Sequence, residues 1–107
     1  MRPSLCFNPL LATIALVCVA SAAHAQDAAA LRSRALAATC ASCHGTGGRA
    51  VDNAAVPGLA GLPAAYLAEQ MRDFKAGTRP ATVMHQLAKG YSDAQIAELA
   101  AYFAATR

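Results

Sequence analysis

The feature that most constrains this chain is the five-residue sequence Cys40-Ala41-Ser42-Cys43-His44. On one helical turn the two thiols reach the same side of the backbone, and the imidazole of His44 follows directly. This C-x-x-C-H spacing is the signature of c-type haem attachment. Cys40 and Cys43 would bond to two vinyl groups on one porphyrin edge, and His44 would bind the iron from the same side. The sequence therefore predicts one covalently held haem c.

Other uses of two neighbouring cysteines fit less well. A thioredoxin-like redox pair stands at the head of a helix in a βαβ unit, and no segment here alternates like a strand. A structural zinc site needs four ligands. After residue 25 the chain offers only Cys40, Cys43, His44 and His85, and Cys43 and His44 are adjacent, which strains a shared tetrahedron. The spacing also argues against a simple disulfide.

Residues 1–25 have the layout of a secretory signal peptide. Arg2 gives a positive start, an apolar stretch runs from Leu10 to Ala20, and Ala23-His24-Ala25 is a small-x-small cleavage site. The apolar stretch is shorter than the roughly 20 residues needed to span a membrane. We therefore expect a single domain over residues 26–107, located in the periplasm, where haem attachment of this kind occurs. No membrane span is expected after Gln26.

Residues 26–107 have little with which to build a core. They are rich in alanine and contain no tryptophan. At this length the stability that a hydrophobic core provides is marginal without a disulfide, metal or cofactor, so the composition favours a bound cofactor. The chain has nine Lys and Arg against six Asp and Glu. Because no basic run is present, a nucleic-acid partner is not expected.

The hydrophobic pattern is helical throughout. We expect helices near residues 28–39, 63–76 and 83–89, a last helix that begins at Ser92, and a long glycine-rich loop over residues 45–62. In the first helix, Leu31, Ala35 and Leu36 share a face. Pro63 suits a helix start, Gly77 a helix end, and Ser92 with Gln95 forms a capping box. The predicted fold is all-α, a small single domain wrapped around the haem.

The second axial ligand is expected from Met71, Met84 or His85. Met71 lies on an apolar stripe with Leu67 and Phe74, where methionine is usually core filler. Met84 follows a strap over residues 77–82 that could drape over the haem, so Met84 is the favoured ligand. His85 is the rival, although it is expected to face solvent.

Two further residues have expected roles at the haem. Pro57 would either only stiffen its loop, or its carbonyl would accept a hydrogen bond from His44 Nδ1–H and so orient the imidazole. Arg79 in the strap would pair with a haem propionate, or lie solvated. With both axial positions filled, the iron has no site for a substrate, so electron transfer is the predicted task. No catalytic residue is assigned.

The chain resembles the class I c-type cytochromes. The matching pieces are spread over nearly all of residues 26–107: Cys40–His44, Val56–Gly61, Tyr66-Leu67, Phe74–Arg79, Met84 and Ala101–Ala104. In that family the equivalents of His44 and Met84 are the iron ligands. The equivalent of Pro57 carries the carbonyl described above. The resemblance implies a monohaem cytochrome c domain over residues 26–107.

A narrower similarity concerns Arg79–Met84 and Leu87–Asp93, which are similar to the haem subunit of flavocytochrome c sulfide dehydrogenase. That resemblance implies an FAD-bearing flavoprotein subunit as electron donor and another cytochrome as acceptor. His85 stands where the family would have a small residue. Two alternatives remain: a free electron shuttle to an oxidase or reductase, and a haem sensor or peroxidase-like enzyme with an open iron.

Overall fold

The computed structural model describes residues 25–107, and these residues are helical with no strand. The predicted all-α fold class is confirmed. A helix over residues 25–38 is followed by α2 (Ala41–His44), the 3-10 turn η1 (Thr46–Gly48), α3 (Ala64–Ala76), α4 (Met84–Leu87), the 3-10 turn η2 (Ala88–Gly90) and α5 (Asp93–Ala105). Apart from Ala25, the predicted signal peptide lies outside the described residues.

Proline and glycine set the ends of α3, close to where the sequence predicts them. Pro63 caps the helix in extended geometry, so α3 begins one residue later than expected, at Ala64. Gly77 ends it in the left-handed conformation, with φ of 79°. Leu67 is buried on this helix, and Met71 packs against the same core. The expected apolar face of α3 is therefore correct at these two positions.

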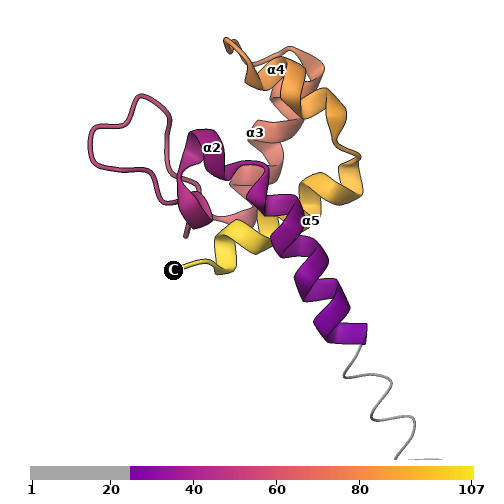
Figure 1. Ribbon diagram of the computed structural model, residues 1–107. Helices are drawn as coiled ribbons and strands as arrows, with labels where there is room; N and C mark the ends of the chain where they lie inside the picture. The colour runs from indigo at the N-terminus through magenta and orange to yellow at the C-terminus, as the bar shows by residue number, and fades with distance from the viewer. Residues whose placement is uncertain (1–24) are drawn as a thin grey trace, which may run out of the picture. The chain divides into compact units, whose positions relative to one another are not determined.

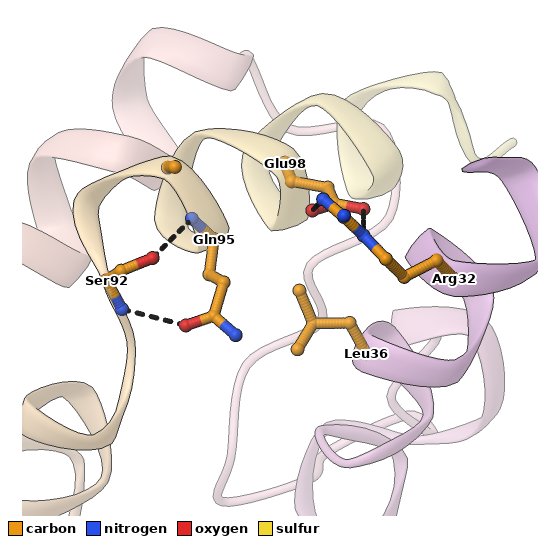
Figure 2. Close-up of a pocket in the computed structure, with 6 residues that line it drawn as sticks. Arg32, Leu36, Ser92, Gln95 and Glu98 are labelled. Atoms are coloured by element: carbon orange, nitrogen blue, oxygen red, sulfur yellow. Dashed lines mark hydrogen bonds and ion pairs between the residues drawn. The ribbon is translucent and has the colours of Figure 1, made fainter.

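The capping box predicted at the start of α5 is present. Ser92 Oγ accepts from the backbone N–H of Gln95 at 3.2 Å, and Gln95 Oε1 accepts from the Ser92 N–H at 2.9 Å (Figure 2). Two of the four backbone N–H groups that a helix start leaves unpaired are satisfied in this way. This fixes where α5 begins and therefore which of its residues face inward.

The core lies mainly between α3 and α5, which pack side by side (Figure 1). The apolar stripe of α5, formed by Ile96, Leu99 and Phe103, is buried there. Four of the eight buried hydrophobic residues are alanines, and Ile96 is the one large side chain that is fully buried among the described residues. So small a core agrees with the prediction that this domain needs a bound cofactor for stability.

The inward face of the first helix differs from the prediction. Leu31 and Ala35 are exposed, whereas Ala37 is buried and Leu36 packs against the core. The expectation rested on side-chain size, and at the contact the small Ala37 faces inward instead. Within residues 25–107, no helix has the length and apolar character that crossing a membrane requires.

Candidate haem site

Cys40, Cys43 and His44 lie together where the first helix ends and α2 begins. The backbone N–H groups of Cys43 and His44 both donate to the carbonyl of Cys40, at 3.3 and 3.0 Å. These bonds close one helical turn over the whole C-x-x-C-H sequence. The turn therefore gathers both thiols and the imidazole in one short stretch of backbone, as the spacing predicts.

The two cysteines are free thiols in different surroundings. Cys43 is exposed, whereas Cys40 is half-buried and packs against the core. Burial raises the pKa of the Cys40 thiol; the hydrogen-bonding contact with Thr39 lowers it, and the neighbouring Cys43 raises it further. Both sulfur atoms remain available for thioether bonds.

His44 is held by the hydrogen bond that the sequence predicts. Its side chain is buried, and Nδ1 lies 2.7 Å from the carbonyl oxygen of Pro57. A carbonyl only accepts, so Nδ1 carries the proton and Nε2 is left with its lone pair. This is the tautomer that an imidazole needs to bind a metal through Nε2. Ring orientation and protonation are thus both fixed by one backbone group.

The loop that carries Pro57 is anchored on the buried residue Gly48. The Gly48 carbonyl accepts from the N–H groups of Leu59 and Ala60, at 2.7 and 3.0 Å. Gly48 itself has φ of 74°, and a Cβ placed there would lie 2.7 Å from the ring of Phe103. Only glycine fits both the backbone angle and the close approach. Gly48 therefore links the orientation of His44 to the core.

Met84 and His85 lie on α4, a different element from the C-x-x-C-H turn. Figure 1 shows α4 beside α3, and α4 contacts α3 and the following turn η2. Met84 is half-buried at the start of α4, between the exposed side chains of Val83 and Leu87. The structure brings Cys40, Cys43 and His44 together, and it places Met84 on a separate segment.

The prediction that His85 faces solvent is wrong. Its side chain is half-buried, and its Nδ1 is buried with no hydrogen-bond partner among residues 25–107. A buried polar atom without a partner costs free energy, because it has lost its bonds to water. The segment beside Met84 therefore carries a polar group that the described protein atoms leave unsatisfied.

Arg79 lies over the ring of Phe74, with its guanidinium carbon 4.6 Å from the ring centroid. It also donates a hydrogen bond to the side chain of Gln70. These contacts hold the strap before α4 against α3. Both contacts help to keep Arg79 half-buried.

A pocket of about 420 Å³ lies elsewhere on the domain, between the first helix and α5 (Figure 2). One wall is an ion pair, in which Arg32 Nη2 lies 2.9 Å from Glu98 Oε2. Ser33 Oγ donates to the same carboxylate at 2.7 Å. None of the predicted haem residues lines this pocket, so it is a separate feature of the surface.

The residues of the C-x-x-C-H turn have the chemistry that covalent attachment of a haem requires. Two free thiols stand on one helical turn, and the neighbouring imidazole presents Nε2 while a carbonyl holds Nδ1–H. The unsatisfied Nδ1 of His85 and the half-buried Met84 lie on a second segment, α4. The imidazole of His44 is a ligand that suits haem iron.

Comparison with protein families gives a match over most of the chain. Residues 27–103 match the family model described as "Cytochrome C oxidase, cbb3-type, subunit III". This match includes the C-x-x-C-H turn, the loop with Pro57, α3, α4 and most of α5.

Three relatives are similar to parts of the chain. A "Thiosulfate dehydrogenase electron acceptor" from Thiomonas intermedia is 49% identical over 67 residues, which is 63% of this chain and 31% of the relative. A "Cytochrome subunit of sulfide dehydrogenase" from Chlorobaculum tepidum is 39% identical over 72 residues, 67% of this chain and 64% of the relative. A "Cytochrome c4" from Pseudomonas aeruginosa is 42% identical over 99 residues, 92% of this chain and 46% of the relative. The chain thus covers less than two thirds of each of these relatives.

Proposed function

Because the chain belongs to the cytochrome c family, as a class I cytochrome c with a covalently bound haem c, we propose that it transfers electrons through a haem ligated by His44 and Met84. Cys40 and Cys43 would form the two thioether bonds, by adding their S–H groups across the haem vinyl groups. The bound haem supplies one-electron redox chemistry. The other tasks, which are to hold, orient and shield it, fall to the residues described above.

The observation that carries this proposal is the hydrogen bond from His44 Nδ1 to Pro57 O at 2.7 Å. It gives His44 one free ring nitrogen and strengthens that nitrogen as a ligand, because the bonded proton makes the ring more electron-rich. It also prevents the ring from turning. With its ring held by Pro57, His44 would need to move little when the haem gains or loses an electron.

Met84 is proposed as the distal ligand. Met84 is the first residue of α4 and directly follows the strap, in which Arg79 packs on the ring of Phe74. A thioether ligand favours the reduced iron, so it raises the reduction potential above that of a bis-histidine haem. If His44 and Met84 both hold the iron, electron transfer is favoured over the haem sensor and peroxidase-like alternatives, which need an open position on the iron.

For the partner, we propose an FAD-bearing subunit that oxidises sulfide, with another cytochrome as the electron acceptor. The support is the name of the Chlorobaculum relative and the small apolar surface beside Met84. Val83 and Leu87 are 55% and 51% exposed there, and no charged residue stands between them in sequence. Exposed apolar side chains near a redox site favour contact through apolar burial rather than steering by charge.

The alternative is a free electron shuttle. It is favoured by the Thiomonas relative, whose name describes an electron acceptor and not a subunit. A shuttle would meet its donor only transiently, so the two functions differ in whether a stable complex exists.

The experiment is affinity capture of the tagged holoprotein from periplasm, followed by sulfide addition without oxygen. Recovery of a stable complex that contains FAD, and whose haem is reduced by sulfide, would support the subunit function. Elution of the protein alone at every salt concentration, with haem reduction that needs no second bound protein, would overturn it in favour of the shuttle. Location in the periplasm, after removal of residues 1–25, is part of the proposal.

A further inference from the structure

Tyr91 joins three segments of the domain. It stands between η2 and the N-cap of α5. Its hydroxyl lies 2.9 Å from Thr39 Oγ1, and its backbone carbonyl accepts a hydrogen bond from Lys75 Nζ of α3 at 2.8 Å. Thr39 is the residue immediately before Cys40. One residue therefore ties the segment that follows Met84 to α3 and to the end of the first helix.

The direction of the Tyr91–Thr39 bond follows from the neighbouring contacts. The Thr39 hydroxyl has one proton, and it donates this proton to the carbonyl of Leu36 at 2.7 Å. The Tyr91 hydroxyl is therefore the donor to Thr39 Oγ1. The Tyr91 ring is half-buried against the core, and Lys75 is held in turn by Asp93 at 2.9 Å. Side chain and backbone of Tyr91 are both fixed.

We propose that Tyr91 is a positioning residue that keeps Met84 on the haem iron. The inference rests on the proposed role of Met84 as axial ligand. Residues 84–91 form one short segment, with Met84 at its start, the fully buried Ala88 in its middle and Tyr91 at its end. The bond to Thr39 attaches the end of this segment to the residue beside the haem-attachment cysteines. The two stretches of chain that carry the proposed axial ligands are thus bonded to each other directly.

Loosening this bond should increase the time that Met84 spends away from the iron. An external ligand such as imidazole binds the iron only in that open form, so its apparent affinity rises in proportion to the open population. Loss of one ordinary hydrogen bond that stabilises only the closed form predicts an increase of about fivefold. This effect is larger than the error of a spectroscopic titration.

The experiment is an imidazole titration of ferric holoprotein, followed by the loss of the near-infrared band of methionine-ligated iron. Tyr91→Phe and Thr39→Val should each bind imidazole about fivefold more tightly than the wild type, because both lack the same bond. Thr39→Ser keeps the hydroxyl and should restore the wild-type affinity. The double variant should bind no more tightly than either single variant, since the two residues share one interaction.

Glu98→Ala is the matched control. Glu98 also links the first helix to the C-terminal part of the chain, through Arg32 and Ser33, but it lies outside residues 84–91. Its removal should lower the stability of the fold and leave imidazole affinity unchanged. If Glu98→Ala raises the affinity as much as Tyr91→Phe does, the effect is general loosening and the positioning role is refuted.

Failure of the inference can be told apart from failure of the proposed function. If all variants bind imidazole as the wild type does, and Met84→Ala abolishes the near-infrared band, Met84 is the ligand and Tyr91 does not position it. If the band is missing from the wild type or survives in Met84→Ala, the ligand assignment itself is wrong. Thr39→Val provides the result if Tyr91→Phe does not fold.

Discussion

Gly48 gives the sharpest test of how the fold supports the proximal ligand. In Gly48→Ala the new Cβ would lie 2.7 and 2.8 Å from two ring carbons of Phe103, and 3.1 Å from Cβ of Leu59. Phe103 is buried and Gly48 has φ of 74°, so neither the ring nor the backbone adjusts without cost. A left-handed conformation costs a residue other than glycine roughly 1–2 kcal/mol. Overpacking a core by one carbon costs roughly 1–3 kcal/mol more.

The expected loss of unfolding free energy for Gly48→Ala is therefore about 2–5 kcal/mol. Gly77→Ala separates the two causes, because Gly77 has φ of 79° but nothing within 4 Å of a Cβ placed there. It should lose only the conformational part, roughly 1–2 kcal/mol. Gly90→Ala, which has neither a positive φ nor a close neighbour, should be nearly neutral.

The assay is urea unfolding of the holoprotein, with the near-infrared and Soret spectra recorded for each folded variant. Because the Gly48 carbonyl anchors the loop that carries Pro57, Gly48→Ala should also alter the ligation of His44. If Gly48→Ala loses no more stability than Gly77→Ala, the contact with Phe103 does not constrain this position. The argument that Gly48 links His44 to the core would then be wrong.

Three further predictions concern attachment, pH and processing. Haem should stay with the wild-type chain in denaturing electrophoresis and should be lost when Cys40 and Cys43 are both replaced by alanine; colour that separates from the wild type would exclude thioether bonds. The hydrogen bond from Arg32 lowers the pKa of Glu98. The stabilisation of the fold by this pair is therefore present above the ordinary carboxyl pKa of about 4.3, and it is lost as pH falls through the pKa of Glu98 in the folded protein. Urea unfolding at decreasing pH should thus show a smaller acid loss of stability in Glu98→Ala than in the wild type; equal losses would show that the pair contributes nothing. N-terminal sequencing of periplasmic protein should begin at Gln26, and a sequence that begins at Met1 would contradict the predicted signal peptide.

Local sequence signals predicted much of the fold, because their physics is contained in a few neighbouring residues. Pro63 and Gly77 locate α3 to within one residue, and Ser92 with Gln95 marks the start of α5. The prediction that Leu31 and Ala35 share the inward face of the first helix was wrong, because both are exposed. An alanine-rich helix has a weak apolar pattern, so close packing by the small Ala37 decides its face rather than side-chain size.

The site divides in the same way. The hydrogen bond from His44 to Pro57 could be predicted because His44 ends the C-x-x-C-H motif and Pro57 lies in the loop that follows it. The bond between Thr39 and Tyr91 could not, since the two residues are 52 positions apart and threonine and tyrosine hydroxyls occur anywhere on a surface. The orphaned Nδ1 of His85 was also missed, because burial of one ring atom depends on how α4 packs against α3.

The most direct test of the central claim is the near-infrared spectrum of the ferric holoprotein, recorded together with its reduction potential. The wild type should show the weak charge-transfer band of methionine sulfur on haem iron. Met84→Ala should lose the band and have a lower potential, whereas Met71→Leu should keep both, because Met71 packs in the core. A band that survives in Met84→Ala, or a wild type with no band and a low potential, would contradict ligation by Met84; the second result would identify His85 as the ligand.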